Sequence, residues 1–520
     1  MTITTAKRIA ARLPRLAPLA AALMVALPAQ AQWKVTPSLS LTETYTDNAS
    51  LSSDANKRAQ WITEAMPAIR ITGQNSRVQL TADARSSFFS YSDGRPSNAR
   101  RNNTRYDAAG QVKVIDELMY VDATVNAGTR AVSAFGPDEN GVNRYTNENR
   151  TEVGSWSISP YLVQRFGNFA AATLRYTHNE VTSDSSRFGD SSADSVAFDL
   201  FSGRAWRDLG WNVRYARENL DTELFGATVS ENALVGLSYR VHRTLKLTAT
   251  GGYDSYDYET TGGERTAGAS WSTGFVWNPS ARTSVDLAVG RHFLGNTGSL
   301  RAAHRSRHTV WRLSYSDGVT NTRQQFTGEQ GVDTAALIDS LFAVTIPDPV
   351  ARRQAVLDYL QITGLPLSTV ESVNYLSNRY FRQKQVLASF AYTMRKHSSA
   401  VSAFATERVA LSTGEADAGL LGSEFFSLND NVRQVGASAS HSYRLNALTS
   451  ATATLAGSRS RSLTTNLERA EQSLRFSLSR RFSRKLIGNV ELRHVRGDRG
   501  LFGTSDYKEN AISATISAQL

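Results

Sequence analysis

The chain has 520 residues, of which 41% are hydrophobic and 20% charged, with a formal net charge of +11 and no cysteine. After residue 31 no apolar run approaches the roughly 18–20 residues that a membrane-spanning helix needs, which excludes a helical membrane protein. The lack of cysteine excludes disulfide scaffolds, thiolate metal sites and cysteine nucleophiles.

Residues 1–31 have the three-part organisation of a secretory signal peptide. An apolar stretch from Leu16 to Leu27 follows a basic start, and Ala29-Gln30-Ala31 supplies a small-x-small cleavage site. The basic residues are Lys7, Arg8, Arg12 and Arg15. We therefore predict export and cleavage, leaving residues 32–520, whose net charge is +7 once these four charges are subtracted from +11.

Residues 32–520 alternate between apolar and polar side chains from end to end. Clear examples are Met119–Ala127, Ala233–Val241, Val285–Val289, Leu474–Leu478 and Ile512–Leu520. A period of two residues indicates a β-strand with one apolar face, and runs of about ten residues match tilted membrane-spanning strands. The pattern predicts an all-β fold.

The connections between these runs favour a barrel over a soluble sandwich. Ten short turn-like breaks, one of them at 317–318, alternate with eleven longer polar stretches, one of them at 295–303. Short turns at one end and long loops at the other are typical of bacterial outer-membrane barrels, whose strand number is even. We predict a transmembrane antiparallel β-barrel of about 22 strands, within a range of 16–22, spanning residues 32–520.

One segment departs from the alternation. Within 331–378, the spacing of apolar residues predicts two helices, over Asp333–Val344 and Asp348–Gly364. Asp348 suits a helix cap, Pro349 the first helical position and Gly364 a stop. We expect this helical insert to be either an outer loop or a plug in the barrel.

Three sets of side chains are candidate functional residues of a barrel. Aromatic residues of outward parity beside short turns predict a girdle at one membrane–water boundary: Phe166, Trp206, Trp211, Tyr239, Trp277, Tyr443 and Phe482. Arginines of the opposite parity are predicted to face the lumen: Arg85, Arg175, Arg214, Arg240, Arg312, Arg475 and Arg493. The last strand is predicted to carry the insertion signal: Ile512, Ala514, Ile516, Ala518 and Leu520.

Two interpretations of the lumen arginines stay open. In the first, arginines that face each other inside the barrel favour anions. Alternatively, each one pairs with a neighbouring carboxylate such as Asp83, Asp286 or Glu491 and fills the interior.

Several segments resemble one known family. They are Tyr120–Val125, Ser159–Leu162, Arg165–Phe169, Trp277–Ser280, Ser314–Ser316, Thr322–Gln325 and Asn378–Phe381. These segments are similar to the PEP-CTERM system-associated outer-membrane proteins of Gram-negative bacteria, whose genes lie with exopolysaccharide and protein-sorting loci. The resemblance implies a role in moving or anchoring an extracellular polysaccharide, and it supplies no catalytic residues. The chain departs from the usual barrel pattern at Leu520, where such barrels end in an aromatic residue.

Motifs for catalysis or cofactor binding are missing from the sequence. None of the eight histidines lies in His-Glu-x-x-His, and neither Gly-x-Ser-x-Gly nor a Walker loop occurs. His304 and His308 are four residues apart, which in one strand separates them by about 13 Å, too far for a shared metal. We expect no enzyme activity, no cofactor and no metal site. Export makes nucleic acid an improbable partner of this basic chain.

Three functions remain, in decreasing order. The first is a non-enzymatic barrel of an exopolysaccharide and PEP-CTERM sorting system, acting as a channel, docking or assembly component. The second is a general or anion-preferring porin, and the third an outer-membrane hydrolase. The expected partners are outer-membrane lipid and lipopolysaccharide, the barrel-assembly machinery, and exopolysaccharide or its periplasmic export components. No plug domain precedes the first predicted strand at Trp33, so an energised plugged receptor is not expected.

Overall fold

The computed structural model describes most of the chain, and the statements below refer to the part that it describes. This part comprises residues 32–137, 145–146, 149–184, 188–223, 226–258, 266–323, 334–343, 346–363, 365, 374–412, 426–498 and 506–520. The predicted signal peptide, residues 1–31, lies outside it.

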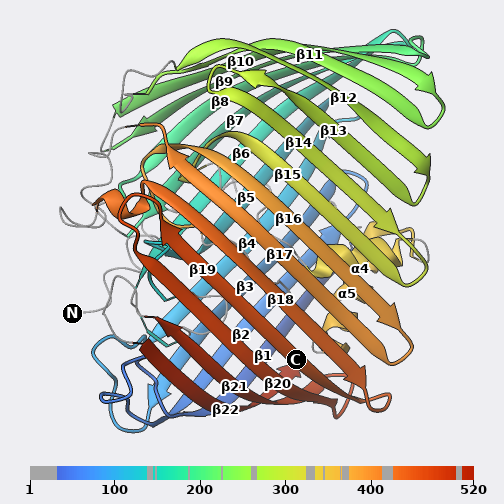
Figure 1. Ribbon diagram of the computed structural model, residues 1–520. Helices are drawn as coiled ribbons and strands as arrows, with labels where there is room; N and C mark the ends of the chain where they lie inside the picture. Colours follow the sequence, from blue (N-terminus) through green and yellow to red (C-terminus); the bar gives the residue numbers. More distant parts are fainter. Residues whose placement is uncertain are drawn as a thin grey trace.

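Twenty-two antiparallel strands form one closed sheet, which confirms the predicted barrel and its strand number (Figure 1). Each strand pairs with the next along the chain, and β1 pairs with β22 to close the ring. The strands are β1 (Gln32–Thr46), β2 (Gln60–Gln74), β3 (Val78–Tyr91), β4 (Asn102–Ile115), β5 (Met119–Ala131), β6 (Arg150–Phe166), β7 (Ala170–Ser183), β8 (Ser191–Ser202), β9 (Leu209–Thr222), β10 (Gly226–His242), β11 (Leu245–Tyr256), β12 (Ala267–Ser280), β13 (Thr283–His292), β14 (Gly295–Arg305), β15 (Thr309–Asn321), β16 (Tyr380–Met394), β17 (His397–Ala410), β18 (Asn431–Arg444), β19 (Thr449–Ser462), β20 (Glu468–Arg481), β21 (Leu486–Asp498) and β22 (Asp506–Gln519).

The two ends of the barrel differ in their connections. Short turns such as that between β2 and β3 lie at one end, here called the turn end, where β1 also begins and β22 ends. The other end, here called the loop end, carries the longer connections, including the one between β15 and β16 that contains the helices.

The predicted connections at 295–303 and 317–318 were wrong, although the strand count is unaffected. Residues 295–305 form β14, and Asp317-Gly318 lies inside β15. Gly295, at φ +107°, takes the tight turn before β14, and backbone pairing with β13 holds the polar run that follows it in a strand. Asp317 is satisfied in mid-strand because Arg382 donates to its carboxylate over 2.7 and 2.9 Å.

Alternate side chains of each strand face outward and inward. On β1, Leu39 and Leu41 are exposed on the outer face, whereas Thr42, Thr44 and Thr46 are buried inside. Since paired residues share a face, this alternation continues from strand to strand through the whole register. The result is an apolar outer surface and a polar interior.

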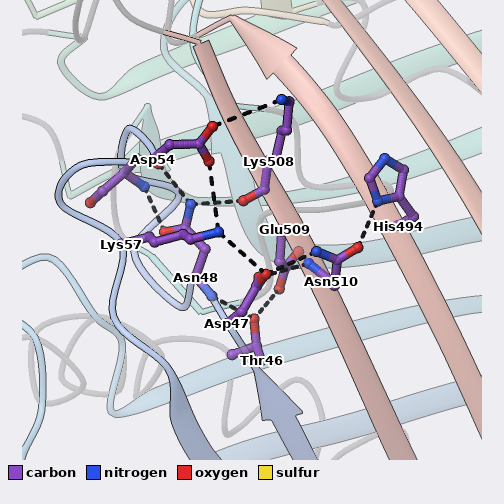
Figure 2. Close-up of polar contacts among 10 residues, drawn as sticks. Thr46, Asp47, Asn48, Asp54, Lys57, His494, Lys508, Glu509 and Asn510 are labelled. Carbon is purple, nitrogen blue, oxygen red and sulfur yellow. Dashed lines mark hydrogen bonds and ion pairs between the residues drawn. The ribbon is translucent and has the colours of Figure 1, made fainter.

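Polar contacts at the loop end reinforce the closure between the first and last strands (Figure 2). Both the backbone N–H and the side-chain amide of Asn510 donate to Asp47 over 2.8 Å, and the Asn48 amide donates to the Lys508 carbonyl over 2.9 Å. Asp54 lies 3.8 Å from the Lys508 ammonium. These contacts extend the β1–β22 pairing beyond its last backbone pair, Thr46 with Ala511.

The insert folds into the barrel. It contains α4 (Thr334–Phe342) and α5 (Pro349–Thr363), and a further short helix, η2 (Phe426–Asn429), precedes β18. In Figure 1, α4 and α5 lie within the barrel near the turn end. They contact β15, β16 and β18–β20, so a segment that leaves from the loop end reaches the opposite end of the lumen. None of the described helices is long and apolar enough to cross a membrane.

Candidate functional site in the lumen

The register places all seven predicted lumen arginines on the inward-facing side of their strands. Arg175, for example, lies between Leu174 and Tyr176, which are both exposed on the outer face, and Arg240 lies between Tyr239 and Val241 in the same way. The same parity holds for Arg85, Arg214, Arg312, Arg475 and Arg493.

Several of these arginines pair with carboxylates. Arg175 lies 2.8 Å from Asp122, and Arg214 lies 2.5 Å from Asp199. Both pairs are about one-third exposed or more, so the lumen beside them is accessible to water.

Asp83, one of the three carboxylates suggested as partners of the lumen arginines, pairs with a different arginine. Asp83 pairs with Arg70, at 2.9 Å, and with none of the seven predicted arginines. Asp286 lies opposite Arg301 in the β13–β14 register, and Glu491 lies opposite Ser477 and Ser513. Pairing depends on which strands become neighbours and at what height, which one strand's alternation does not encode.

A stack of rings occupies the lumen wall near the turn end. Tyr120 and Tyr161 are cross-strand partners whose ring centroids lie 5.2 Å apart at an interplanar angle of 13°. The Arg175 guanidinium lies 3.9 Å from the centre of the Tyr161 ring, and Gln111 donates to the Tyr161 hydroxyl over 3.0 Å. With Asp122, these groups present donors, acceptors and aromatic surface to one part of the lumen.

Hydroxyl pairs continue this polar wall toward the loop end. Thr124 and Ser157 lie 2.7 Å apart, and Ser159 and Thr177 lie 2.8 Å apart. The wall formed by β3–β9 is therefore lined by hydroxyls, amides and ion pairs. It is here called the polar wall.

Sequence reasoning did not single out the stacked tyrosines. A signal was nevertheless present, because Tyr120, Tyr161 and Arg175 all have inward parity next to a turn on three consecutive strands. The cross-strand register that brings them together became visible only in the fold.

The opposite wall, β15–β20, is covered by the helices and is here called the plug wall. Leu337, Ile338, Val356 and Leu360 are buried against Val310 and neighbouring residues of the wall. Polar anchors add to this packing, since Ser442 and Thr452 donate to the Thr363 carbonyl at the end of α5. The Thr452 bond is 2.7 Å long. The helices are therefore held by both apolar contacts and wall hydroxyls.

A buried layer crosses the loop end. Phe135 from the β5–β6 connection and Tyr375 from the segment before β16 pack with Phe381, Leu428 and Val432 in one cluster. A neighbouring cluster joins Val153, Val181, Phe188 and Leu376. Because β6 and β7 are about ten strands away from β16–β18 around the ring, these contacts span the lumen.

Buried charges tie this layer together. Arg323, which follows β15, reaches across to β7 and donates to the Asn179 side chain over 3.0 Å. Burial lowers the pKa of Arg323 to about 10, which still leaves it charged at neutral pH. Arg379 forms an ion pair with Asp430, whose pKa is raised by burial.

The predicted girdle residues lie near the turn end. Phe166, Tyr239 and Phe482 are more than half exposed on the outside of the barrel, and Trp206 and Trp211 pack edge to face at 6.0 Å. Trp277 and Tyr443 are outward-facing as well.

A second group of outward aromatics lies toward the loop end and was missed. It includes Tyr45 and Trp61, whose centroids are 5.2 Å apart, together with Phe88, Tyr253 and Trp271. The same parity at the opposite ends of the strands would have identified it.

The C-terminal strand lies against both neighbours with its predicted residues outward. Ile512, Ala514, Ile516 and Ala518 pair with outward residues of β21, and Ile516 is 56% exposed. Leu520 follows the strand, is 68% exposed and donates its backbone N–H to the Pro37 carbonyl over 2.9 Å.

The two histidines four residues apart are not in one strand, contrary to the expectation. His304 lies in β14, 2.9 Å from the Thr283 hydroxyl, whereas His308 lies in the turn before β15. In the described part of the chain, histidine and carboxylate side chains form no group of three suited to a metal ion.

Residues 31–190 match the model of a family described as "Putative beta-barrel porin 2". The comparison with curated proteins finds no match. Among solved structures, the FrpB iron transporter from Neisseria meningitidis is 9% identical, with a TM-score of 0.49, 93% of this chain and 81% of that chain covered. A mutant ferric enterobactin receptor (PfeA) from Pseudomonas aeruginosa, in complex with enterobactin, is 8% identical, with a TM-score of 0.48 and coverages of 94% and 81%. The siderophore receptor PirA from the same species is 9% identical, with a TM-score of 0.44 and coverages of 93% and 80%.

The family match adds to what the fold shows independently. In a closed 22-stranded antiparallel sheet with an apolar outside and a polar inside, the strands pair with one another around the whole ring, as a β-structure that spans a membrane requires. This chain folds as a transmembrane β-barrel of the outer-membrane type.

Proposed function

We propose that this protein is a non-enzymatic channel for an extracellular polysaccharide, working with a PEP-CTERM sorting system in a Gram-negative outer membrane. In such barrels the short turns face the periplasm, so the stacked tyrosines and the helices would meet a polymer arriving from that side. We further propose that residues 1–31 are removed on export and that the barrel-assembly machinery inserts the chain.

The polar wall is the observation that carries the proposal. Asp122, Arg175 and Gln111 offer hydrogen-bond acceptors and donors beside the stacked rings of Tyr120 and Tyr161. Sugars present hydroxyls around an apolar ring face, and binding sites for small polar molecules combine a few convergent polar groups with aromatic surface. Because Arg175 is charge-matched by Asp122, the site suits neutral, hydroxyl-rich rings better than anions.

Planar-bilayer recording tests this proposal. We expect the intact protein to conduct weakly, because the helices cover one wall and loops cross the loop end. Deletion of residues 334–363 should raise the conductance, and maltohexaose should then block the current reversibly. Substitution of both Tyr120 and Tyr161 by Ala should weaken the block. Arg214→Gln is the control: it breaks an ion pair of the same wall away from the tyrosine rings and should leave the block intact. A deletion variant that folds and passes no current would contradict the channel and favour a docking or assembly role.

An anion-preferring porin is the second candidate, favoured by the inward parity of seven arginines. The carboxylates beside Arg175, Arg214 and Arg493 count against a strong preference. Gene context separates the candidates further, because neighbouring polysaccharide-synthesis and sorting genes support the first and a nutrient operon supports the second.

A further inference from the structure

A groove lies at the turn end between the barrel wall and α4. It has a volume of about 380 Å³ and is lined by residues of β12–β15, the turn between β12 and β13, and Ser340 of α4. Three arginines, Arg282, Arg305 and Arg312, contribute to the lining together with the hydroxyls of Ser280 and Ser284. The groove is therefore basic and rich in hydrogen-bond donors.

Two of these arginines also hold the helix. Arg305 Nη1 donates to the Ser340 carbonyl over 3.1 Å, and Arg312 Nη2 donates to the Ala336 carbonyl over 3.2 Å and to the Ser340 hydroxyl. Ser340 lies in the last turn of α4, where carbonyls lack helical donors and the helix dipole is negative. Helix α4 is thus held to the wall by two arginine side chains that donate hydrogen bonds to uncharged oxygens.

An oxyanion would compete well with these acceptors. Hydrogen bonds from arginine to a charged phosphate oxygen are roughly twice as strong as those to neutral groups, and the arginine fork fits phosphate geometry. The carboxylate closest along α4, Asp339, is engaged by Arg352 over 2.8 Å. On the wall, Asp286 lies one row away, opposite Arg301.

We propose that this groove is a binding site for a phosphoryl group presented from the periplasm, and that its occupation releases α4 from the wall. Arg282, Arg305 and Arg312 would bind the phosphoryl oxygens, and the Ala336 and Ser340 carbonyls would lose the hydrogen bonds that Arg312 and Arg305 donate to them. The apolar contacts of Leu337, Ile338 and their neighbours would then be the remaining attachment of α4 to the wall. The binding step needs no current through the barrel, so it stands apart from the proposed channel.

A cysteine reporter tests the proposal directly in the full-length protein. The chain has no cysteine, and Leu337 is fully buried against the wall, so Leu337→Cys creates a single thiol that a maleimide can reach only when α4 moves. We expect saturating inorganic phosphate to raise the labelling rate about tenfold over chloride of equal ionic strength, within the usual range of coupling between sites. Glucose 6-phosphate is the second probe: if it acts at lower concentration than inorganic phosphate, the ligand is a sugar phosphate rather than free phosphate.

Matched variants distinguish the site from general loosening. In the described contacts, Arg282 makes no side-chain hydrogen bond to α4, so Arg282→Gln should lower the phosphate sensitivity while leaving labelling without phosphate unchanged. Arg305→Gln with Arg312→Gln should raise labelling without phosphate and remove the phosphate response. Ser517→Cys, which faces the lumen on β22 and belongs to neither the groove nor the tyrosine site, should be labelled equally in all conditions. Phosphate-independent labelling of Leu337→Cys, or a response that survives Arg282→Gln together with Arg305→Gln, would overturn the proposal.

Discussion

The polar wall and the plug wall are built from the same strand pattern but have different interiors. On β3–β9, inward arginines such as Arg175 and Arg214 meet carboxylates in contact with water. On β15–β20, inward residues such as Val310 and Ala391 are buried under α4 and α5. Alternation thus determines which side chains face inward. Whether they line an open lumen or a buried core depends on whether the helices cover them.

The largest effect is expected where a charge pair is buried. Arg493 and Glu509 lie 2.7 Å apart with side chains only 5% and 1% exposed. Arg493→Gln should lower the free energy of unfolding by about 3–5 kcal/mol, because it leaves a buried carboxylate uncompensated. Urea titration of the detergent-folded protein measures this change. Arg175→Gln is the matched control, since its pair is about one-third exposed and should cost at most about 1 kcal/mol. Equal losses would show that the two pairs share one environment.

The next effect concerns the packing of the plug. Leu337 is fully buried between α4 and the wall. Leu337→Ala should weaken the attachment of the insert by about 2–5 kcal/mol through lost apolar contact and a cavity. The expected readout is faster proteolysis of the insert in a barrel that still shows heat-modifiable mobility on detergent gels. If the whole barrel unfolds instead, the plug wall depends on its helices for stability and is not simply covered by them.

The outer surface gives a smaller effect. Ile516 faces outward on the last strand, whereas Ser517 faces the lumen opposite Ser40. Ile516→Asp should lower the amount of protein in outer-membrane fractions, because a lipid-facing charge is costly, and Ser517→Asp should be tolerated. At the terminus, Leu520→Phe should insert as well as the native chain or better, and Leu520→Asp should insert poorly. Normal membrane levels of Leu520→Asp would mean that this residue does not contact lipid.

The smallest effect is expected for ion selectivity. Replacing Arg175, Arg214 and Arg475 by Gln removes three inward positive charges, and the first two of these arginines pair with carboxylates in contact with water. Reversal potentials should shift only modestly toward cations, and the shift should vanish near 1 M salt, where the screening length is about 3 Å. A large shift at low salt would instead support the anion-preferring porin.

The sequence alone predicted the architecture because strand alternation is a local property. A period of two residues and the order of short and long connections led to a 22-stranded barrel, which the fold confirms. Helix signals such as Asp348 before Pro349 also correctly located α5 to within a residue at each end.

Contacts between distant segments could be read only from the tertiary structure. Asp317-Gly318 has the residue types of a turn, but Arg382, 65 residues away, donates hydrogen bonds to the Asp317 carboxylate within β15. Register likewise pairs Asp83 with Arg70 and stacks Tyr120 on Tyr161. Leu337 is buried against the plug wall because its segment folds back into the lumen. Side-chain periodicity determines the face of each residue, whereas closure of the ring determines its neighbours.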